Sequence, residues 1–275
     1  MESMAGKTAV VTGAASGIGR ALADECIAEG MNVVLADVED RALDAAMASL
    51  AAVSSRVTAV RVNVADPQQV ESLATQAVER FGKIHLLFNN AGVGAGTTIW
   101  DSTLEDWTWV MGVNLWGVIH GIRSFVPRML AHGEPGYIVN TASTAGLTRS
   151  HLSASYGVTK HAVVALSEQL AAELERVGSN LHAAVLCPSW VNTRINESGR
   201  NRPAELANTT PLPEPTSEMH KRWEDMQAVV AAATPASEIA RFTFDGLKTG
   251  KFYLLPHPES FEWVRARFRA IENDF

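Results

Sequence analysis

Thr12-Gly13-Ala14-Ala15-Ser16-Gly17-Ile18-Gly19 is the stretch that decides the fold, because it lies between an apolar run, Thr8 to Val11, and a helix-prone segment, Arg20 to Ala28. Its three glycines allow backbone conformations that a Cβ would forbid, so a diphosphate can approach the chain and the free N–H groups of the helix start. The spacing is G-x-x-x-G-x-G with a threonine in front, which is narrower than the general dinucleotide pattern. The stretch therefore predicts a nucleotide-binding turn between a strand and a helix.

Short apolar runs alternate with helical stretches along the rest of the chain. The runs lie at Thr8–Val11, Asn32–Ala36, Val57–Val62, His85–Phe88, Tyr137–Asn140, His182–Leu186 and Phe252–Leu255. Regular alternation predicts a parallel sheet covered on both faces, which explains why these runs are apolar throughout and not at every second position. We expect an α/β fold, a doubly wound Rossmann fold with a seven-stranded parallel sheet flanked by helices on both faces.

Composition favours one soluble domain spanning residues 1–275. The chain is 47% hydrophobic and carries a net charge of −7 without any run of lysine or arginine, so a nucleic-acid partner is not expected. Cys26 and Cys187 lack the spacing of a metal site and fit a reducing compartment as two inert thiols. Neither a secretion signal nor an apolar run of ~18 residues is recognisable. We therefore expect a cytoplasmic protein without a metal and without a membrane partner.

Two C-terminal segments depart from the alternation. Residues 194–235 carry five prolines, and a loop of roughly 40 residues inside a compact domain is normally functional or disordered. We expect this segment to form a lid loop over the substrate pocket. Residues 258–272 predict a charged amphipathic helix, which would pack on a partner subunit or fold over its own site.

Asp37 follows the second apolar run, where this architecture meets the adenosine ribose of a dinucleotide. A carboxylate accepts from two ribose hydroxyls and repels a 2′-phosphate. Neither Val38 nor Ser16 supplies the positive charge that a phosphorylated cofactor would need. The position therefore favours NAD over NADP; alternatively, Asp37 is a solvated acid at the strand end or a cap for the helix from Glu39.

Tyr156 and Lys160 are four residues apart at the start of a predicted helix that runs to about Val177, so both side chains share one face. A nearby ammonium favours the phenolate, which makes the pair suited to moving a proton. Such a pair can arise by chance, so the motifs that accompany it decide the interpretation. These motifs are Asn89-Asn90-Ala91-Gly92 after the fourth apolar run, Asn114 on a long helix over about Leu104–Leu130, and Ser143 after the fifth run.

With these motifs the chain resembles a short-chain dehydrogenase/reductase over about residues 6–193, the Pro-x-x-Val-x-Thr segment Pro188–Thr193 included. The resemblance implies that Tyr156 exchanges the proton of the substrate alcohol and that Ser143 hydrogen-bonds the substrate oxygen. Lys160 would lower the Tyr156 pKa and bind the nicotinamide ribose. Asn114 would hold a water that relays protons; alternatively, it is a helix-kink or core hydrogen-bonding residue.

The cofactor contacts that the resemblance implies run from the diphosphate to the nicotinamide. They are Gly13, Ser16 and Ile18 for the diphosphate, Asp37 for the ribose, Asn63 and Val64 for adenine, and Asn90, Tyr156, Lys160, Val191 and Thr193 around the nicotinamide half. Two positions depart from the family pattern: Asn63 stands where the family often has Asp, and Ser189 stands where it usually has Gly. Neither departure touches Asn114, Ser143, Tyr156 or Lys160.

The substrate pocket is the least readable part of the chain. Trp100, Trp190, Met219, Trp223 and Met226 suggest an apolar lining and a bulky hydrophobic or aromatic substrate; alternatively, they anchor the lid or fill an interface. For His151 we favour an ordinary loop histidine over a substrate contact. For Trp107, Trp109 and Trp116 we expect core or subunit contacts.

These inferences predict an oxidoreductase that transfers hydride between NAD and a secondary alcohol or its ketone. The family resemblance implies a homodimer or homotetramer formed through the helices that carry Asn114 and Tyr156. An NADP-dependent ketone reductase is the nearest alternative. A catalytically idle NAD-binding regulator is a further one, against which the intact set of Asn114, Ser143, Tyr156 and Lys160 counts.

Overall fold

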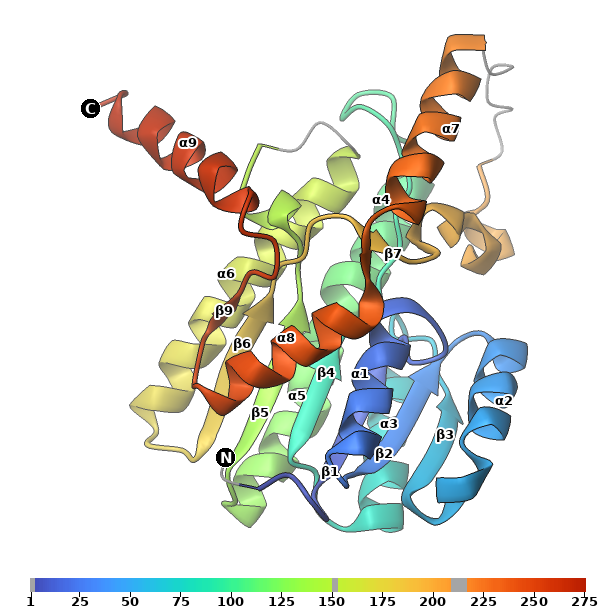
Figure 1. The fold of residues 1–275 in the computed structure, drawn as a ribbon, viewed down its shortest axis with the longest axis vertical. Coiled ribbons are helices and arrows are strands. Elements are labelled where there is room, and N and C mark those ends of the chain that lie inside the picture. Colours follow the sequence, from blue (N-terminus) through green and yellow to red (C-terminus); the bar gives the residue numbers. More distant parts are fainter. Residues whose placement is uncertain (1–2, 150–152, 209–216) are drawn as a thin grey trace.

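Seven strands form one parallel sheet in the order β3-β2-β1-β4-β5-β6-β9 (Figure 1). The computed structural model describes residues 3–149, 153–208 and 217–275, except for the side chains of residues 217–220, 222 and 223. The strands are β1 Thr8–Thr12, β2 Asn32–Asp37, β3 Val57–Arg61, β4 Leu86–Asn89, β5 Gly136–Thr141, β6 Leu181–Leu186 and β9 Tyr253–Leu254. The predicted doubly wound, seven-stranded parallel sheet is confirmed.

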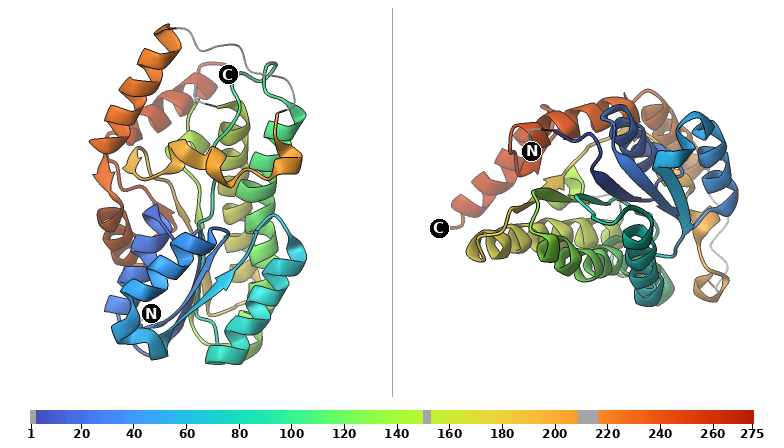
Figure 2. Two further views of the ribbon diagram at one scale, coloured as in Figure 1. Left: turned by 90° about the vertical axis from the view of Figure 1, so that its right-hand side faces the viewer. Right: turned by 90° about the horizontal axis from the view of Figure 1, so that it is seen from below.

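Alternate residues of each strand enter two separate hydrophobic cores. Val11 and Phe88 pack with α1, α2 and α8, whereas Val10 and Leu87 pack with α3, α5 and α6 on the other face (Figure 2). These helices are α1 Gly17–Ala28, α2 Asp40–Ser49, α8 Ala236–Lys248, α3 Pro67–Phe81, α5 Gly117–His132 and α6 Ala154–Arg176, and a 3-10 turn, Ala51–Arg56, joins α2 to β3. Burial on both faces is why the strands read as continuous apolar runs.

The long helix predicted over Leu104–Leu130 is interrupted in its middle. It consists of α4 Leu104–Met111, a π-helical segment Gly112–Trp116 and then α5. At its start, Thr103 and Asp106 form a capping box in which each side chain accepts from the other residue's backbone N–H. The π segment contains Asn114, and such an inserted turn commonly marks a functional position.

The segment 194–235 is not the loop that its prolines suggested. It contains the 3-10 turns Ile195–Asn201 and Ala204–Leu206, helix α7 Ser217–Ala231, and β8 Thr234–Pro235, which pairs in parallel with β7 Val191–Asn192. The described prolines explain the difference: Pro203 and Pro235 each directly precede a helical turn, where a missing N–H is tolerated. We call residues 194–208 the lid strap below.

The predicted C-terminal helix is present as α9, Ser260–Glu272. Figures 1 and 2 show it reaching away from the sheet and its covering helices, with the chain terminus at its far end. None of the described helices, α9 included, combines the length and apolar content needed to span a membrane.

Candidate active site and cofactor cleft

A cavity of about 1780 Å³ opens at the carboxyl ends of the strands. Drug-sized ligands occupy pockets of roughly 300–1,000 Å³, so this cavity has room for two ligands side by side. Its walls include Ser143 and every predicted cofactor contact, namely Gly13, Ser16, Ile18, Asp37, Asn63, Val64, Asn90, Tyr156, Lys160, Val191 and Thr193. Asn114 is not among the lining residues.

The glycine turn forms the floor of one end of the cavity. Gly13 and Gly17 have φ values of +66° and +54°, which residues with a Cβ rarely adopt. A Cβ on Gly19 would lie 2.1 Å from the Gly13 carbonyl oxygen, so the turn folds tightly onto the start of α1. Ser16 makes no side-chain cap to the first N–H groups of α1, which leaves them as donors. This cradle fits the diphosphate of a dinucleotide.

Asp37 lies at the end of β2 with its carboxylate held by two backbone groups. One oxygen accepts from Ala15 N–H at 2.9 Å and the other from Glu39 N–H at 3.0 Å. The second bond agrees in part with the alternative that Asp37 caps the helix from Glu39. Because Asp37 joins the glycine turn to the start of α2 and lines the cavity, its charge is fixed where an adenosine ribose would lie.

An ion pair closes the adenosine end of the cavity from the lid strap. Arg200 donates from Nη2 and Nε to Glu39 Oε1 at 2.7 and 3.0 Å, and Asn201 Nδ2 donates to the same oxygen at 2.9 Å. Burial alone would raise the Glu39 pKa, but the hydrogen bonds from Arg200 and Asn201 outweigh burial and leave this pKa below its ordinary value. Sequence reasoning missed this contact because its partners are 161 positions apart and belong to no motif.

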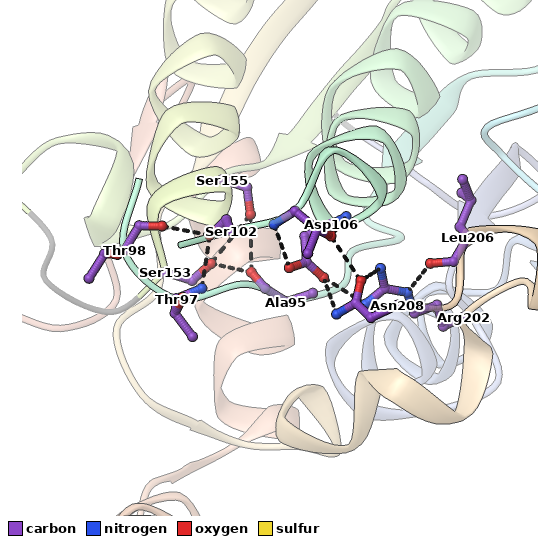
Figure 3. Close-up of polar contacts among 11 residues, drawn as sticks. Ala95, Thr97, Thr98, Ser102, Asp106, Ser153, Ser155, Arg202, Leu206 and Asn208 are labelled. Carbon is purple, nitrogen blue, oxygen red and sulfur yellow. Dashed lines mark hydrogen bonds and ion pairs between the residues drawn. The ribbon is translucent and has the colours of Figure 1, made fainter. Parts of the chain in front are cut away.

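Two residues further on, the lid strap is anchored to the opposite wall (Figure 3). Arg202 Nη1 donates to Asp106 Oδ1 at 2.6 Å, and its other nitrogens donate to Asn208 Oδ1 and the Leu206 carbonyl. The guanidinium also lies 5.3 Å from the centroid of the Trp109 ring. Burial works to raise the Asp106 pKa, yet the Arg202 hydrogen bond and the Thr103 N–H bring it below the ordinary value. The strap therefore bridges the cavity between two charged anchors.

We expect the Arg202→Met variant to lose about 3 kcal/mol of unfolding free energy, because it leaves the Asp106 carboxylate buried without its cation. The two side chains are only 15% and 7% exposed. The matched control is Arg194→Met, whose pair with Glu197 is half exposed on both sides and should contribute under ~1 kcal/mol. Urea unfolding of both variants measures the difference. Equal losses would mean that the Arg202 pair acts as an ordinary surface ion pair.

The loop after β4 is tied to the start of α6 (Figure 3). The hydroxyls of Ser153 and Ser155 both donate to the Ala95 carbonyl, the second at 3.0 Å. Within the loop, Ser102 Oγ accepts from Thr97 N–H at 2.9 Å. Since Tyr156 follows at once, these bonds set the position of its helical turn relative to the cavity.

Ser143, Tyr156 and Lys160 meet at the other end of the cavity. Ser143 follows β5 in extended conformation, and its hydroxyl lies 3.3 Å from the Pro188 carbonyl. Lys160 Nζ donates to the Thr141 carbonyl at 2.8 Å and lies 5.4 Å from the centroid of the Tyr156 ring. The end of β5 and the first two turns of α6 thus bring a hydroxyl, a phenol and an amine to one wall.

The titration of this group differs from the expectation that Lys160 lowers the Tyr156 pKa. Burial raises the Tyr156 pKa, with the Ser143 hydroxyl acting in the opposite direction. Burial also lowers the Lys160 pKa to about 8. The Lys160 amine lies over the tyrosine ring and donates to a backbone carbonyl, and burial is the largest cause of the change in both pKa values.

Asn114 lies behind this wall and supports it. Its Oδ1 accepts from Val93 N–H at 2.8 Å, and its Nδ2 donates to the Val93 carbonyl at 2.9 Å and to Thr159 Oγ1 at 3.3 Å. The core hydrogen-bonding alternative is thus present in the structure. A Cβ built on Gly92 would lie 3.5 Å from both Asn114 Oδ1 and Lys160 Nζ, so these two polar groups both lie close to the Cβ side of Gly92.

Only some of the residues proposed from the sequence to line the substrate pocket do so in the structure. Trp190 and Met226 line the cavity. The placement of Trp100 was wrong, because its side chain is 81% exposed and outside the cavity. His151 and the side chains of Met219 and Trp223 lie outside the described residues.

Other lining residues were not foreseen. Trp107, Trp109 and Trp116, expected in the core or at a subunit contact, all line the cavity, and Trp109 is also buried. Trp263 and Arg267 of α9 contribute a further wall. Their arrangement depends on how separate helices pack, which residue spacing does not report.

Comparisons with known proteins agree with this geometry. The family model described as short chain dehydrogenase matches residues 7–204. A short chain dehydrogenase/reductase from Burkholderia phymatum, solved in complex with NAD, is 43% identical with a TM-score of 0.94, over 100% of this chain and 97% of that one. The 1-deoxy-11-beta-hydroxypentalenate dehydrogenase of Streptomyces avermitilis is 42% identical over 68% of this chain and 69% of its own. The CLA biosynthesis dehydrogenase/reductase of Lactiplantibacillus plantarum is 30% identical over 100% and 96%.

Proposed function

Because the chain belongs to the short-chain dehydrogenase family, whose members are oxidoreductases, we propose that it oxidises a bulky hydrophobic or aromatic secondary alcohol with NAD, or reduces the matching ketone. The observation that carries this proposal is the meeting of Ser143, Tyr156 and Lys160 in the cavity whose other end contains Asp37. Trp190 and Met226 support an apolar substrate.

Each polar residue has a chemical task in this proposal. NAD, when bound, supplies the hydride acceptor. The Tyr156 phenolate takes the proton of the substrate hydroxyl, and Ser143 donates a hydrogen bond to the same oxygen while charge develops on it. Protonated Lys160 offsets part of the effect of burial on the Tyr156 pKa, and Asn114 holds a water through which the proton taken up by Tyr156 passes to solvent. Reduction uses the same groups in the opposite order.

The preference for NAD rests on charge at the adenosine end. Asp37 and Glu39 both line the cavity there, and a 2′-phosphate would meet two carboxylates. Arg200 offsets the charge of Glu39, so the carboxylate that repels the phosphate is mainly that of Asp37. The NAD complex of the Burkholderia phymatum relative supports the same choice.

The proposal includes a homodimer or homotetramer formed through the helices that carry Asn114 and Tyr156. Two apolar side chains support it: Trp116, on the long helix, is 51% exposed, and Val158, on α6, is 46% exposed. Side chains of this kind on neighbouring helices suit a subunit contact.

The test is a fluorescence titration with NADH and NADPH, followed by assays of NADH formation from aliphatic, steroidal and aryl secondary alcohols. We expect tighter binding of NADH and a kcat/KM for an aryl or steroidal alcohol at least about tenfold above that for 2-butanol, since each buried CH₂ contributes ~0.8 kcal/mol. Tight binding without turnover on any alcohol or ketone would favour the NAD-binding regulator. Tighter binding of NADPH would favour the NADP-dependent ketone reductase.

A further inference from the structure

One face of α9 is apolar and exposed. Phe261, Val264, Phe268, Ile271 and Phe275 recur at alternating intervals of three and four residues, so they lie on one side of the helix and its continuation. Phe268 is 54% exposed, and Phe261 and Ile271 are 45% exposed. This is the spacing at which two helices bury apolar side chains against each other. We call this set the Phe268 face.

The Phe268 face has no cover within the described part of the chain. α9 does not pack extensively against any described helix or strand. A different side of the helix, with Trp263, Ala266 and Arg267, lines the cavity, where Arg267 Nη1 lies 3.4 Å from the Leu147 carbonyl. This side of the helix faces the cavity while its phenylalanines meet water. A contiguous apolar stripe of this kind marks an interaction surface.

We propose that the Phe268 face pairs in antiparallel fashion with the Phe268 face of a second copy of this chain, around a two-fold axis beside Phe268. Each residue then faces the one equally far on the other side of that axis, so Phe261 meets the partner's Phe275. A self-complementary surface is what a two-fold dimer requires. The heptad spacing selects a helix as the occupant, and this helix carries the matching spacing itself.

Charge and shape select the antiparallel direction. Arg265 and Glu272 flank the Phe268 face on the same side of α9, so in this register Arg265, whose direct counterpart is Ile271, lies diagonally across from the partner's Glu272. Within the described residues Arg265 pairs with Glu262, and Glu272 forms no ion pair. Antiparallel helices also oppose their dipoles favourably. Figure 1 shows α9 leaving the body at its first turn, so antiparallel pairing places the two bodies at opposite ends of the helix pair. Parallel pairing would bring both bodies to the same end.

The pairing also bears on the cavity. Trp263 and Arg267 line it from the same helix that carries the Phe268 face. A helix that is covered by a second copy is held in place along its length. The contact between copies thereby fixes one wall of the site.

Cysteine cross-linking of the full chain tests the proposal. Identical residues meet at a two-fold axis, so a Phe268→Cys variant should form a covalent dimer under mild oxidation, within the ~4.4–6.8 Å that a disulfide allows between Cα atoms. A Phe261→Cys variant should not, because its counterpart lies 14 residues along the helix, roughly 20 Å away. Arg269→Cys, on the charged side of α9, is the matched negative control. Cys26 and Cys187 are buried and do not compete.

The outcomes separate the alternatives. Cross-linking of the Phe268→Cys variant alone supports the proposal; cross-linking of the Phe261→Cys variant to itself indicates a parallel pair and overturns it. Equal cross-linking at positions 268 and 269, or none at 268, also overturns it. Activity is not measured, so the result is independent of the proposed function.

A second measurement tests the pairing without an added cysteine. The Phe268→Glu variant brings two carboxylates together at the axis and should weaken the α9 contact at least about 100-fold in dissociation constant. Sedimentation velocity should then show the assembly halved, from a tetramer to the dimer that is formed through the helices that carry Asn114 and Tyr156. Val177→Glu, at an exposed apolar position outside α9, is the control and should leave the mass unchanged. An unchanged mass for Phe268→Glu at micromolar concentration would contradict the pairing.

Discussion

The Tyr156→Phe variant should lose about 10³-fold in kcat while its affinity for NADH stays within about twofold, because general acid–base groups typically contribute 10²–10⁴-fold. The substitution removes only the hydroxyl, and the ring can keep its contact with Lys160, whose Nζ lies 5.4 Å from the ring centroid. Steady-state rates in both directions and an NADH titration measure the two quantities.

The pH dependence of kcat for the parent enzyme and the Tyr156→Phe variant checks the role of Tyr156 as the acid–base group. Burial raises the Tyr156 pKa, so the phenolate is a minor species at neutral pH and its fraction grows up to tenfold per pH unit below that pKa. Alcohol oxidation needs the phenolate and should accelerate as pH rises from 7 to 8. Above pH 8 the rise should flatten, because Lys160, with a pKa of about 8, loses the charge that stabilises the phenolate. Ketone reduction needs the phenol and should not accelerate. Tyr156→Phe should abolish the rise.

The control for this substitution is Tyr253→Phe, which removes the same atom at an exposed tyrosine whose hydroxyl contacts Glu168. It should leave kcat unchanged. If Tyr156→Phe retained kcat within tenfold of the parent, another group would have to move the proton, and the roles of Ser143 and Lys160 would have to be assigned again.

The fold could be predicted from the sequence because the residues that determine each strand and the glycine turn lie within single short segments. A strand buried on both faces must be apolar along its whole length, and the turn at Gly13 to Gly19 needs glycine where φ is positive or where a Cβ would collide with backbone. Both requirements are visible in single short segments. The predicted strands accordingly match the observed ones to within a residue or two at their ends.

The parts that escaped prediction depend on contacts between distant segments. Arg200 and Glu39 are 161 positions apart and carry no motif, so their ion pair became visible only with the lid strap in place. The predicted loop over residues 194–235 contains helical turns, because Pro203 directly precedes one of them and does not interrupt it. Trp100 was placed in the pocket from its nearness in sequence to Asn90, but the loop after β4 turns it to solvent.

Removing the charge of Asp37 should have the second largest effect. The Asp37→Asn variant is expected to change the ratio of kcat/KM for NAD to that for NADP by at least about 100-fold in favour of NADP. The reason is that two unit charges ~4 Å apart interact by about 4 kcal/mol at an effective dielectric constant of 20, and each 1.4 kcal/mol is tenfold. The asparagine keeps the size of the side chain and one carbonyl oxygen for the N–H groups of Ala15 and Glu39. Saturation kinetics with each cofactor measure the ratio.

Asp40→Asn provides the comparison, since it removes the same charge three residues away, at a carboxylate that is 58% exposed and paired with Arg61. Screening by solvent should leave its cofactor ratio within about twofold of the parent. If both variants changed the ratio equally, net charge near the β2 end would govern selection, and the fixed position of Asp37 would be irrelevant. If neither changed it, the remaining candidate is Glu39, whose partner Arg200 would then turn towards a 2′-phosphate, and the Glu39→Gln variant would separate these two roles.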